Sequence, residues 1–260
     1  MFNAITAGVR GEEQWRRSGA ERSNPREGRE PSRIRSIQEE DSVSINLDMG
    51  KRVVLDTDAM AWLASPASGV WRKPLDRDGG EVARATSIVR YDPGAAFNSH
   101  SHDGGEEVFV LEGVFEDDEG RYPAGTYLRN PPGSSHAPGS MDGCKLFVKL
   151  RQFQQGDADR VRIDTGRAEW RQGLVPGLGV MPLHQFGQEN VALVRWQPRT
   201  FFQPHSHFGG EEILVLEGVF EDEFGAYPTG TWMRSPHMSR HQPFSREGCT
   251  ILVKTGHLSA

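Results

Sequence analysis

Short apolar runs bounded by Gly, Pro, Asp and Asn recur from about residue 50 to the end of the chain. Runs of this kind are typical of β-strands, and no long segment shows the 3.6-residue period of an amphipathic helix. In the first half the pattern predicts strands over 83–91, 107–115, 126–129 and 145–151. Several short strands per hundred residues with frequent turns favour an all-β protein, built as a sandwich or jelly-roll barrel.

The same pattern occurs twice along the chain. Residues 53–57 open the first copy and residues 161–165 the second, and from Arg90 onward the copies keep a fixed spacing. Matching pairs include Arg90/Arg195, Pro93/Pro198, Gly113/Gly218, Tyr122/Tyr227, Pro123/Pro228, Gly125/Gly230, Arg129/Arg234 and Pro131/Pro236. This duplication predicts two tandem domains, over residues 49–153 and 154–260. We expect their sheet edges to be buried against each other as an intramolecular pseudo-dimer, and the sequence leaves further assembly into a homo-oligomer open.

Residues 1–48 differ from the rest of the chain. They are rich in Arg, Glu, Ser and Gly, contain no Lys, and show no apolar periodicity. Such a composition predicts a disordered N-terminal extension. A tethering or partner-binding tail is the alternative, as is a start site placed upstream of a true initiation near Met49; we favour a non-folding extension.

Composition narrows the function classes. The formal net charge of -6 and the sequence pI of about 5.9 disfavour nucleic-acid binding, which needs a dense positive surface. No apolar run approaches the roughly 18–20 residues that span a bilayer, and no secretory signal is visible at the N-terminus. The two cysteines, Cys144 and Cys249, hold equivalent places in the two copies, so we expect buried, reduced thiols and a cytoplasmic protein.

Each copy carries a set of candidate metal ligands. The first set lies in His100-Ser101-His102-Asp103-Gly104-Gly105-Glu106 with His136 further on. The second set is His205, His207, Glu211 and His241, and each ligand follows its counterpart by 105 residues. Alternate residues of a strand face the same way, so the two histidines of each His-x-His can share one wall of a site. Three imidazoles and a carboxylate predict one divalent metal per domain, with Zn, Fe, Mn, Ni and Cu all open.

The spacing around these ligands resembles the two cupin motifs. The first copy has Gly94, then His100, His102, Glu106 and Gly113, followed by Gly125, Pro131, Gly133 and His136. The trailing Asn of the second motif is absent from both copies, which have Ser140 and Ser245 there. The second copy departs further, with Arg199 for the leading Gly and Met238 for the Gly before the last His. The segments 104–107, 110–115, 122–127 and 129–136 are similar to the cupin domain of ChrR-type anti-sigma factors. The resemblance implies two tandem cupin barrels over about residues 50–260.

The resemblance also implies candidate functions. Related cupins include dioxygenases that cleave C–C bonds of diketones or hydroxyacetophenones, so we expect a mononuclear metal-dependent oxygenase acting on a small diketone or phenolic substrate. Glu106 could leave the metal and act as a catalytic base. The alternative is a non-enzymatic, ChrR-like metal sensor or regulator of an oxidative-stress response, and isomerase or lyase chemistry also stays open. Residues 1–48 lack the His and Cys ligands of the ChrR sigma-binding domain, which argues against an anti-sigma factor of that design.

The remaining polar residues receive structural interpretations. Glu107 and Glu212 are one residue out of phase with the ligands and should face away from the metal. Tyr122, Tyr227, Arg129 and Arg234 could line the sites, but packing between duplicated strands is the favoured interpretation. His184, His237 and His257 match no partner in the other copy, and we expect them at the solvated surface.

Overall fold

The computed structural model describes residues 44–80 and 82–258. All regular elements in these ranges are β-strands, so the all-β prediction is confirmed. The expected disorder of residues 1–48 falls almost wholly outside the described residues. In the described part of the chain no helix is long and apolar enough to cross a lipid bilayer.

Two similar series of strands follow one another. The first series is β1 (Ser44–Ile45), β2 (Val53–Asp56), β3 (Leu63–Ala64), β4 (Val70–Asp78), β5 (Arg84–Tyr91), β6 (Ala95–Ala96), β7 (His100–His102), β8 (Glu106–Asp117), β9 (Gly120–Pro123), β10 (Thr126–Asn130), β11 (Ser134–His136), β12 (Gly139–Ser140) and β13 (Cys144–Leu150). The second is β14 (Val161–Asp164), β15 (Arg171–Gln172), β16 (Leu178–Phe186), β17 (Glu189–Trp196), β18 (Thr200–Phe201), β19 (His205–His207), β20 (Glu211–Asp222), β21 (Gly225–Pro228), β22 (Thr231–Ser235), β23 (Ser239–His241), β24 (Phe244–Ser245) and β25 (Cys249–Thr255). The four strands predicted in the first half correspond to β5, β8, β10 and β13, with ends that differ by two residues at most.

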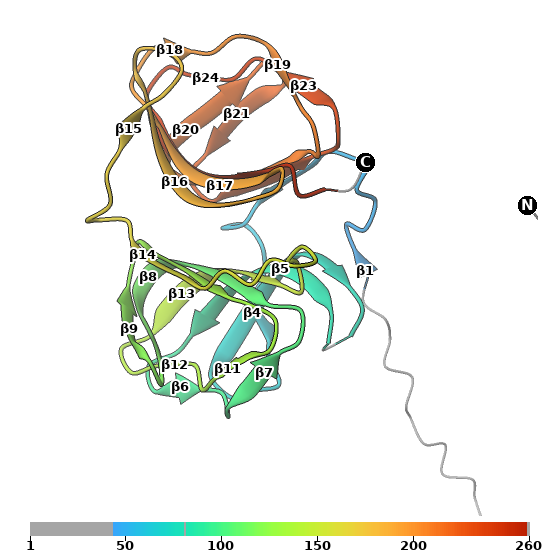
Figure 1. The fold of residues 1–260 in the computed structure, drawn as a ribbon, viewed down its shortest axis with the longest axis vertical. Coiled ribbons are helices and arrows are strands. Elements are labelled where there is room, and N and C mark those ends of the chain that lie inside the picture. The colour runs from blue at the N-terminus through green and yellow to red at the C-terminus, as the bar shows by residue number, and fades with distance from the viewer. Residues whose placement is uncertain (1–43, 81, 259–260) are drawn as a thin grey trace, which may run out of the picture. The chain divides into compact units, whose positions relative to one another are not determined.

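Each half closes into an antiparallel barrel (Figure 1). The main path of the first sheet runs β1-β4-β5-β13-β8-β10-β14, and that of the second runs β15-β16-β17-β25-β20-β22-β2. The long strands β8 and β20 each run through both sheets of their barrel. A bulge in each strand, where the register against β13 or β25 changes, bends it from one sheet into the other. At this bend Gly113 has a φ of 71°, and a Cβ there would collide with the backbone oxygen of Gly143. Two tandem cupin-type barrels are therefore present.

The opening strand of each repeat joins the sheet of the other repeat. β2, from the start of the first repeat, pairs antiparallel with β22, and Val53 lies opposite Arg234. β14, from the start of the second repeat, pairs with β10, and Thr126 lies opposite Asp164. β14 thus follows the expected domain boundary between residues 153 and 154 in sequence but belongs to the sheet of the first barrel. This exchange covers two sheet edges and links the barrels as a pseudo-dimer.

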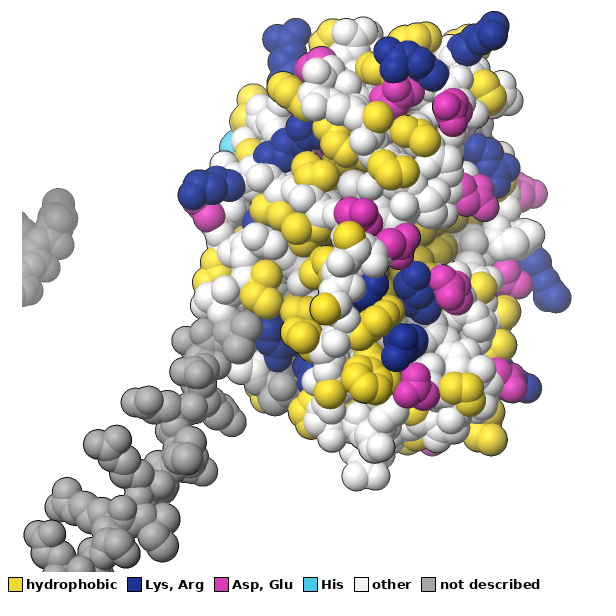
Figure 2. All heavy atoms as spheres, turned by 180° about the vertical axis from the view of Figure 1, so that it is seen from behind, with side chains coloured by type: hydrophobic (Ala, Val, Ile, Leu, Met, Phe, Trp, Pro, Cys, Tyr) yellow, Lys and Arg dark blue, Asp and Glu magenta, His cyan; other side chains and the backbone are white. Residues whose placement is uncertain are grey.

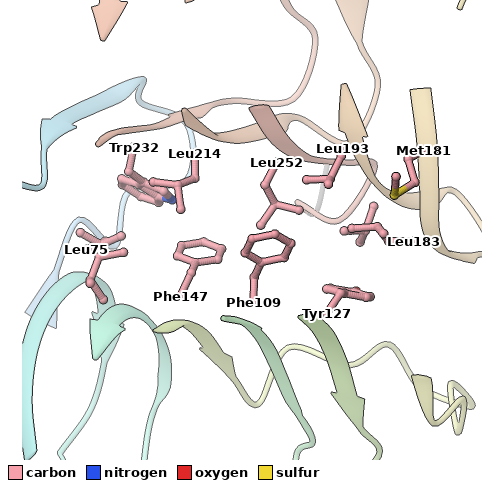
Figure 3. Close-up of a cluster of buried hydrophobic side chains, with 12 residues drawn as sticks. Leu75, Phe109, Tyr127, Phe147, Met181, Leu183, Leu193, Leu214, Trp232 and Leu252 are labelled. Atoms are coloured by element: carbon pink, nitrogen blue, oxygen red, sulfur yellow. The ribbon is translucent and has the colours of Figure 1, made fainter. Parts of the chain in front are cut away.

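Apolar side chains fill three regions. One cluster lies within each barrel, around Val110 and Phe115 in the first and around Val215 and Phe220 in the second. The third lies between the barrels, where their large sheets face each other (Figure 3). Its fully buried members are Leu75, Ile88, Phe109, Tyr127, Phe147, Met181, Leu183, Val191, Leu193, Leu214, Trp232 and Leu252. Burying one such side chain contributes roughly 1.5–3 kcal/mol, so the barrels depend on each other for stability.

Buried charges are paired across the same interface. Lys149 of the first barrel lies 2.6 Å from Glu212 of the second, and Lys254 of the second lies 2.8 Å from Glu107 of the first. Glu107 and Glu212 therefore face away from the candidate ligands, as predicted. Burial alone would raise the pKa of each carboxyl group, but the cationic partners outweigh burial and lower both pKa values. On the outer face drawn in Figure 2, by contrast, Lys and Arg alternate with Asp and Glu.

Candidate metal centres

The three histidines of the first set come from two adjacent short strands. His100 and His102 lie on β7, and His136 lies on β11, which pairs with β7 so that His136 is directly opposite His100. One nitrogen of each ring lies within 4.8 Å of the others, as the His-x-His pattern requires. His102 and His136 are buried, whereas His100 is exposed. The cluster is therefore held on one side and accessible on the other.

A tight glycine turn brings Glu106 to the same place. Gly105 has a φ of 76°, and a Cβ there would collide with the ring of Phe153. The turn reverses the chain, so β8 starts at Glu106 beside β7. The Glu106 Oε2 atom lies 3.6 Å from His102 Nε2 and 3.5 Å from His136 Nε2.

The spacing of these atoms fits a metal ion. His102 Nε2 and His136 Nε2 are 2.9 Å apart. Two nitrogen ligands at right angles, each about 2.1 Å from one ion, would lie about 3.0 Å apart. Glu106 is close to two of the rings but is not part of the group of three histidines whose ligand atoms all lie within 4.8 Å of one another. Three His and one Glu would leave a five- or six-coordinate ion with room for a further ligand.

Groups behind the rings orient them. His100 donates from Nδ1 to the Asn98 carbonyl at 2.9 Å, because a carbonyl can only accept, and this leaves Nε2 free to bind a metal. His136 Nδ1 lies 3.2 Å from Asp117 Oδ2, and Tyr122 donates to the other oxygen of Asp117 at 3.0 Å. These contacts select the tautomer that a metal site needs.

Burial and charge act on the rings in opposite directions. Burial lowers the pKa of His102 and outweighs the attraction of Glu106. Burial also acts to lower the pKa of His136, but the hydrogen bond to Asp117 and the charge of Glu106 outweigh it and raise that pKa. The Asp117 pKa falls to about 2, although burial opposes the shift, because His136, Tyr122 and a backbone N–H bind its carboxylate. Asp117 is thus a permanent anion behind its ring.

The second set forms a similar cluster. His205 and His207 lie on β19 and His241 lies on β23, with His207 Nε2 and His241 Nε2 2.9 Å apart. Glu211 carboxylate oxygens lie 3.5 Å from His207 and 3.6 Å from His241. Both histidine triads are therefore groups that could hold a metal ion.

The two centres differ in their support. Arg199 and Met238 take the places of Gly94 and Gly133 and still have positive φ values of 62° and 59°, which strains a residue with a side chain. Around the carboxylate ligand the difference is chemical. Asn130 donates to Glu106 at 2.9 Å, and the equivalent residue of the second barrel is Ser235. Burial raises the Glu211 pKa to about 7, and burial lowers the His207 pKa to about 3.

A cavity of about 730 Å³ opens on the first centre and is lined by His100, His102 and Glu106. Its other walls are mainly apolar and include Val89, Phe97, Val148 and Leu150. Tyr91 also lines the cavity and is 6% exposed. The equivalent residue of the second barrel is the buried Trp196, which pairs with Leu178 as Tyr91 pairs with Val70.

Three further histidines were expected at the surface, and for two of them the prediction was wrong. His184 is 8% exposed and lies 3.0 Å from Asp157, and the His257 side chain is 3% exposed and lies 3.2 Å from Glu212. Both are buried because they meet carboxylates at or near the barrel interface, a pairing that periodicity does not reveal. His237 is half-buried and accepts a hydrogen bond from the Gly209 N–H.

His184 also groups with Asp157 and Asp159 as potential metal ligands. Arg129 donates to the same Asp157 oxygen at 2.5 Å, so a fixed cation already occupies this carboxylate. Arg129 and its counterpart Arg234 are completely buried and pair with carboxylates away from the metal centres. The packing interpretation holds for both arginines.

Sequence reasoning missed Asp117 and Asp222. Asp117 ends β8 and supports His136, and Asp222 lies 3.6 Å from His241 Nδ1 in the same way. Tyr122 and Tyr227 donate to these carboxylates, so they support the centres in addition to packing. The repetition of Asp and Tyr at one spacing in both copies was the available signal.

Comparisons with known proteins agree with this architecture. The profile of the ChrR cupin-like domain family matches residues 50–154 and 158–259, which are most of both repeats. A comparison of the sequence with curated proteins finds no match.

Several solved structures share the fold. A protein from Nostoc punctiforme that is provisionally named a dioxygenase has a TM-score of 0.68 at 14% identity, covering 79% of this chain and 82% of its own. Protein Ylba from E. coli has a TM-score of 0.64 at 13% identity, with coverages of 85% and 96%. The oxalate decarboxylase of Lactobacillus farciminis has a TM-score of 0.55 at 13% identity, with coverages of 80% and 87%. At these identities the likeness concerns the fold alone.

Proposed function

The chain belongs to the ChrR cupin-like domain family, and from this premise we propose that it is a metal-binding bicupin with oxygenase activity at its first centre. The substrate class we propose is a small diketone or a phenolic compound. The observation that carries the proposal is the cavity of about 730 Å³ that opens on His100, His102 and Glu106. The fold also carries a protein provisionally named a dioxygenase and an oxalate decarboxylase, which supports an enzyme without choosing its substrate.

The cavity suits a compact organic molecule. Ligand pockets commonly occupy about 300–1,000 Å³ and combine apolar walls with a few polar groups. Val89, Phe97, Val148 and Leu150 supply apolar walls, which favour the methyl or aryl substituents of a diketone or phenol. Two neighbouring substrate oxygens would bind beside the candidate ligands that line the cavity.

We assign His100, His102, Glu106 and His136 as the ligands of one divalent ion, and the four equivalent residues as ligands of a second. Such an ion would act as a Lewis acid and as a template that orients the substrate. Asn130 holds Oε2 of Glu106 at 2.9 Å, which fixes the carboxylate and leaves Oε1 for a substrate proton.

Tyr91 gives the first centre a further polar group. Burial raises its pKa well above 10, so its hydroxyl is a hydrogen-bond donor at neutral pH. A substrate oxygen is a suitable acceptor for this hydroxyl. Trp196 at the equivalent position lacks a hydroxyl, so we assign substrate binding to the first barrel.

The test is metal analysis of untagged protein purified without added metal, together with oxygen consumption in the presence of acetylacetone or a catechol. We expect a redox-active metal and turnover that His102→Ala abolishes and His207→Ala retains. Bound zinc with no oxygen consumption by either substrate would refute the oxygenase.

That refuting result defines the second candidate, a non-enzymatic metal sensor. The observation that favours a sensor is the second centre, which keeps its candidate ligands although its surroundings have lost Asn130 and Tyr91 equivalents. Changes in partner binding or conformation on metal removal would then replace turnover as the relevant readout.

A further inference from the structure

The exchanged opening strands bring an arginine to the candidate metal centre of the other barrel. Arg162 lies on β14 at the start of the second repeat, but its strand pairs with β10 of the first barrel. Arg52 lies directly before β2 at the start of the first repeat, and that strand pairs with β22 of the second barrel. Each arginine thus crosses from its own repeat to the opposite centre.

Arg162 acts on the carboxylate ligand through one amide. Its Nη2 donates to Asn130 Oδ1 at 2.6 Å, and Asn130 Nδ2 donates to Glu106 Oε2 at 2.9 Å. A guanidinium can only donate, so Arg162 fixes the amide with its oxygen outward and its NH₂ group toward Glu106. Without Arg162, the amide could turn and present its oxygen to the carboxylate, which would repel it.

Arg162 also stands behind a histidine ligand. Its guanidinium carbon lies 5.6 Å from the centre of the Tyr122 ring, within the range of a cation–π contact. Tyr122 donates to Asp117, and Asp117 lies 3.2 Å from His136 Nδ1. Two of the four candidate ligands of the first centre are therefore connected to one residue of the second repeat.

Arg52 reaches the second centre by a shorter route. Its Nη2 lies 2.7 Å from Asp222 Oδ2 and 2.8 Å from the Tyr227 hydroxyl. Asp222 is fully buried at its side chain and lies 3.6 Å from His241 Nδ1. Arg52 therefore holds the anion that orients a ligand ring of the second centre.

We propose that Arg162 and Arg52 are positioning residues. Arg162, from the second repeat, completes the metal centre of the first barrel, and Arg52, from the first repeat, completes that of the second. This inference rests on the metal ligands assigned above and adds that neither repeat alone forms a full-affinity centre. Residues behind metal ligands commonly change affinity by about 10- to 100-fold when they are replaced.

The test uses two single-centre backgrounds of the full chain, His207→Ala for the first centre and His102→Ala for the second. The probe is Co²⁺, measured by competition with a chelator and by its visible absorption spectrum, which reports coordination geometry. We expect Arg162→Ala to weaken Co²⁺ binding about 10- to 100-fold and to change the spectrum in the first background only. Arg52→Ala should do the same in the second background only, and Arg162→Lys should restore part of the loss.

Arg167→Ala is the matched control for Arg162, because Arg160 shares its partner Glu119 with Arg162. Arg167 lies five residues further along the chain, is 89% exposed at its side chain, and pairs with Asp164. It should leave both affinities unchanged. Equal losses in both backgrounds, or a loss of thermal stability with unchanged affinity and spectrum, would overturn the proposal.

A second variant covers the case in which Arg162→Ala does not fold. Asn130→Ser introduces the residue that the second repeat carries at this position, so it suits the fold, and it breaks the link to Glu106. We expect it to weaken Co²⁺ binding at the first centre only, and unchanged binding would contradict the route through Asn130. Because Co²⁺ binding is measured without substrate, a failure of the proposed oxygenase would leave this result intact.

Discussion

Replacing Lys149 by methionine should destabilise the protein strongly, because it leaves a carboxylate buried between the barrels. The Lys149 ammonium lies 2.6 and 2.7 Å from the two oxygens of Glu212 and 3.0 Å from Thr86 Oγ1. The two side chains are 1% and 3% exposed, so water cannot replace the lost contacts. Methionine fills a similar volume, which confines the perturbation to the charge.

The magnitude follows from the partners that remain. Removing one member of a buried ion pair costs about 3–5 kcal/mol of unfolding free energy. Glu212 keeps Trp232 Nε1 at 2.9 Å and His257 Nε2 at 3.2 Å, so we expect the lower end, about 3 kcal/mol at pH 7.

The loss should depend on pH. In the wild type the Glu212 pKa is lowered well below its ordinary value of 4.5, so the stabilisation by the pair is present above that value and fades as pH falls through the lowered pKa. Without Lys149, burial raises the pKa of the Glu212 carboxyl group in the folded state above its value in the unfolded chain. The variant then loses stability as pH rises through that raised pKa, so the deficit is larger at pH 7.5 than at pH 5.

The assay is urea unfolding in EDTA at both pH values, with Glu212→Gln and the double variant completing a cycle. The double variant should recover part of the loss, since an amide is less costly to bury than an unpaired carboxylate. Lys254→Met, at the pseudo-equivalent position, should behave similarly toward Glu107. A deficit below about 1 kcal/mol that does not vary with pH would refute the reasoning, because an exposed pair behaves that way.

Three further changes test local features. Met238→Gly should raise the free energy of unfolding by about 1 kcal/mol in urea titrations, because glycine adopts a φ of 59° without strain. A decrease of similar size in the free energy of unfolding would contradict strain at this turn. Gly105→Ala should abolish metal binding at the first centre, measured by metal content in the His207→Ala background, since its Cβ would displace Phe153; normal content would show that the turn adapts. Cys144 and Cys249 should resist iodoacetamide at pH 8 until the protein is unfolded, because burial raises both pKa values to about 11, and rapid labelling of the native protein would contradict this.

Local spacing made the histidine clusters predictable. Alternation in a strand puts His100 and His102 on one wall, and the turn glycines fix where Glu106 follows. The strands themselves were predictable because apolar runs are bounded by turn residues. Their partners were not, since nothing in the sequence of β2 or β14 states which barrel each joins.

The buried polar residues were harder to interpret. His257 was expected at the surface because it lacks a counterpart, yet Glu212 accompanies it in the interior. Aspartate is common in turns, so the sequence gives Asp117 no special role, and only the folded chain brings it to His136. Pairings of this kind depend on tertiary contacts, which a periodic pattern does not encode.

The strand exchange sets an order for folding during synthesis. The first barrel needs residues only to about β14, so its sheet can close once the start of the second repeat has left the ribosome. β2 must wait for β22, and the hydrogen bond from Thr57 to Gly230 joins residues 173 positions apart. Until then β2 is a free strand in a nascent chain, with an edge that could pair wrongly. The barrel with the large cavity can therefore form early, and the second barrel closes only when nearly the whole chain has been made.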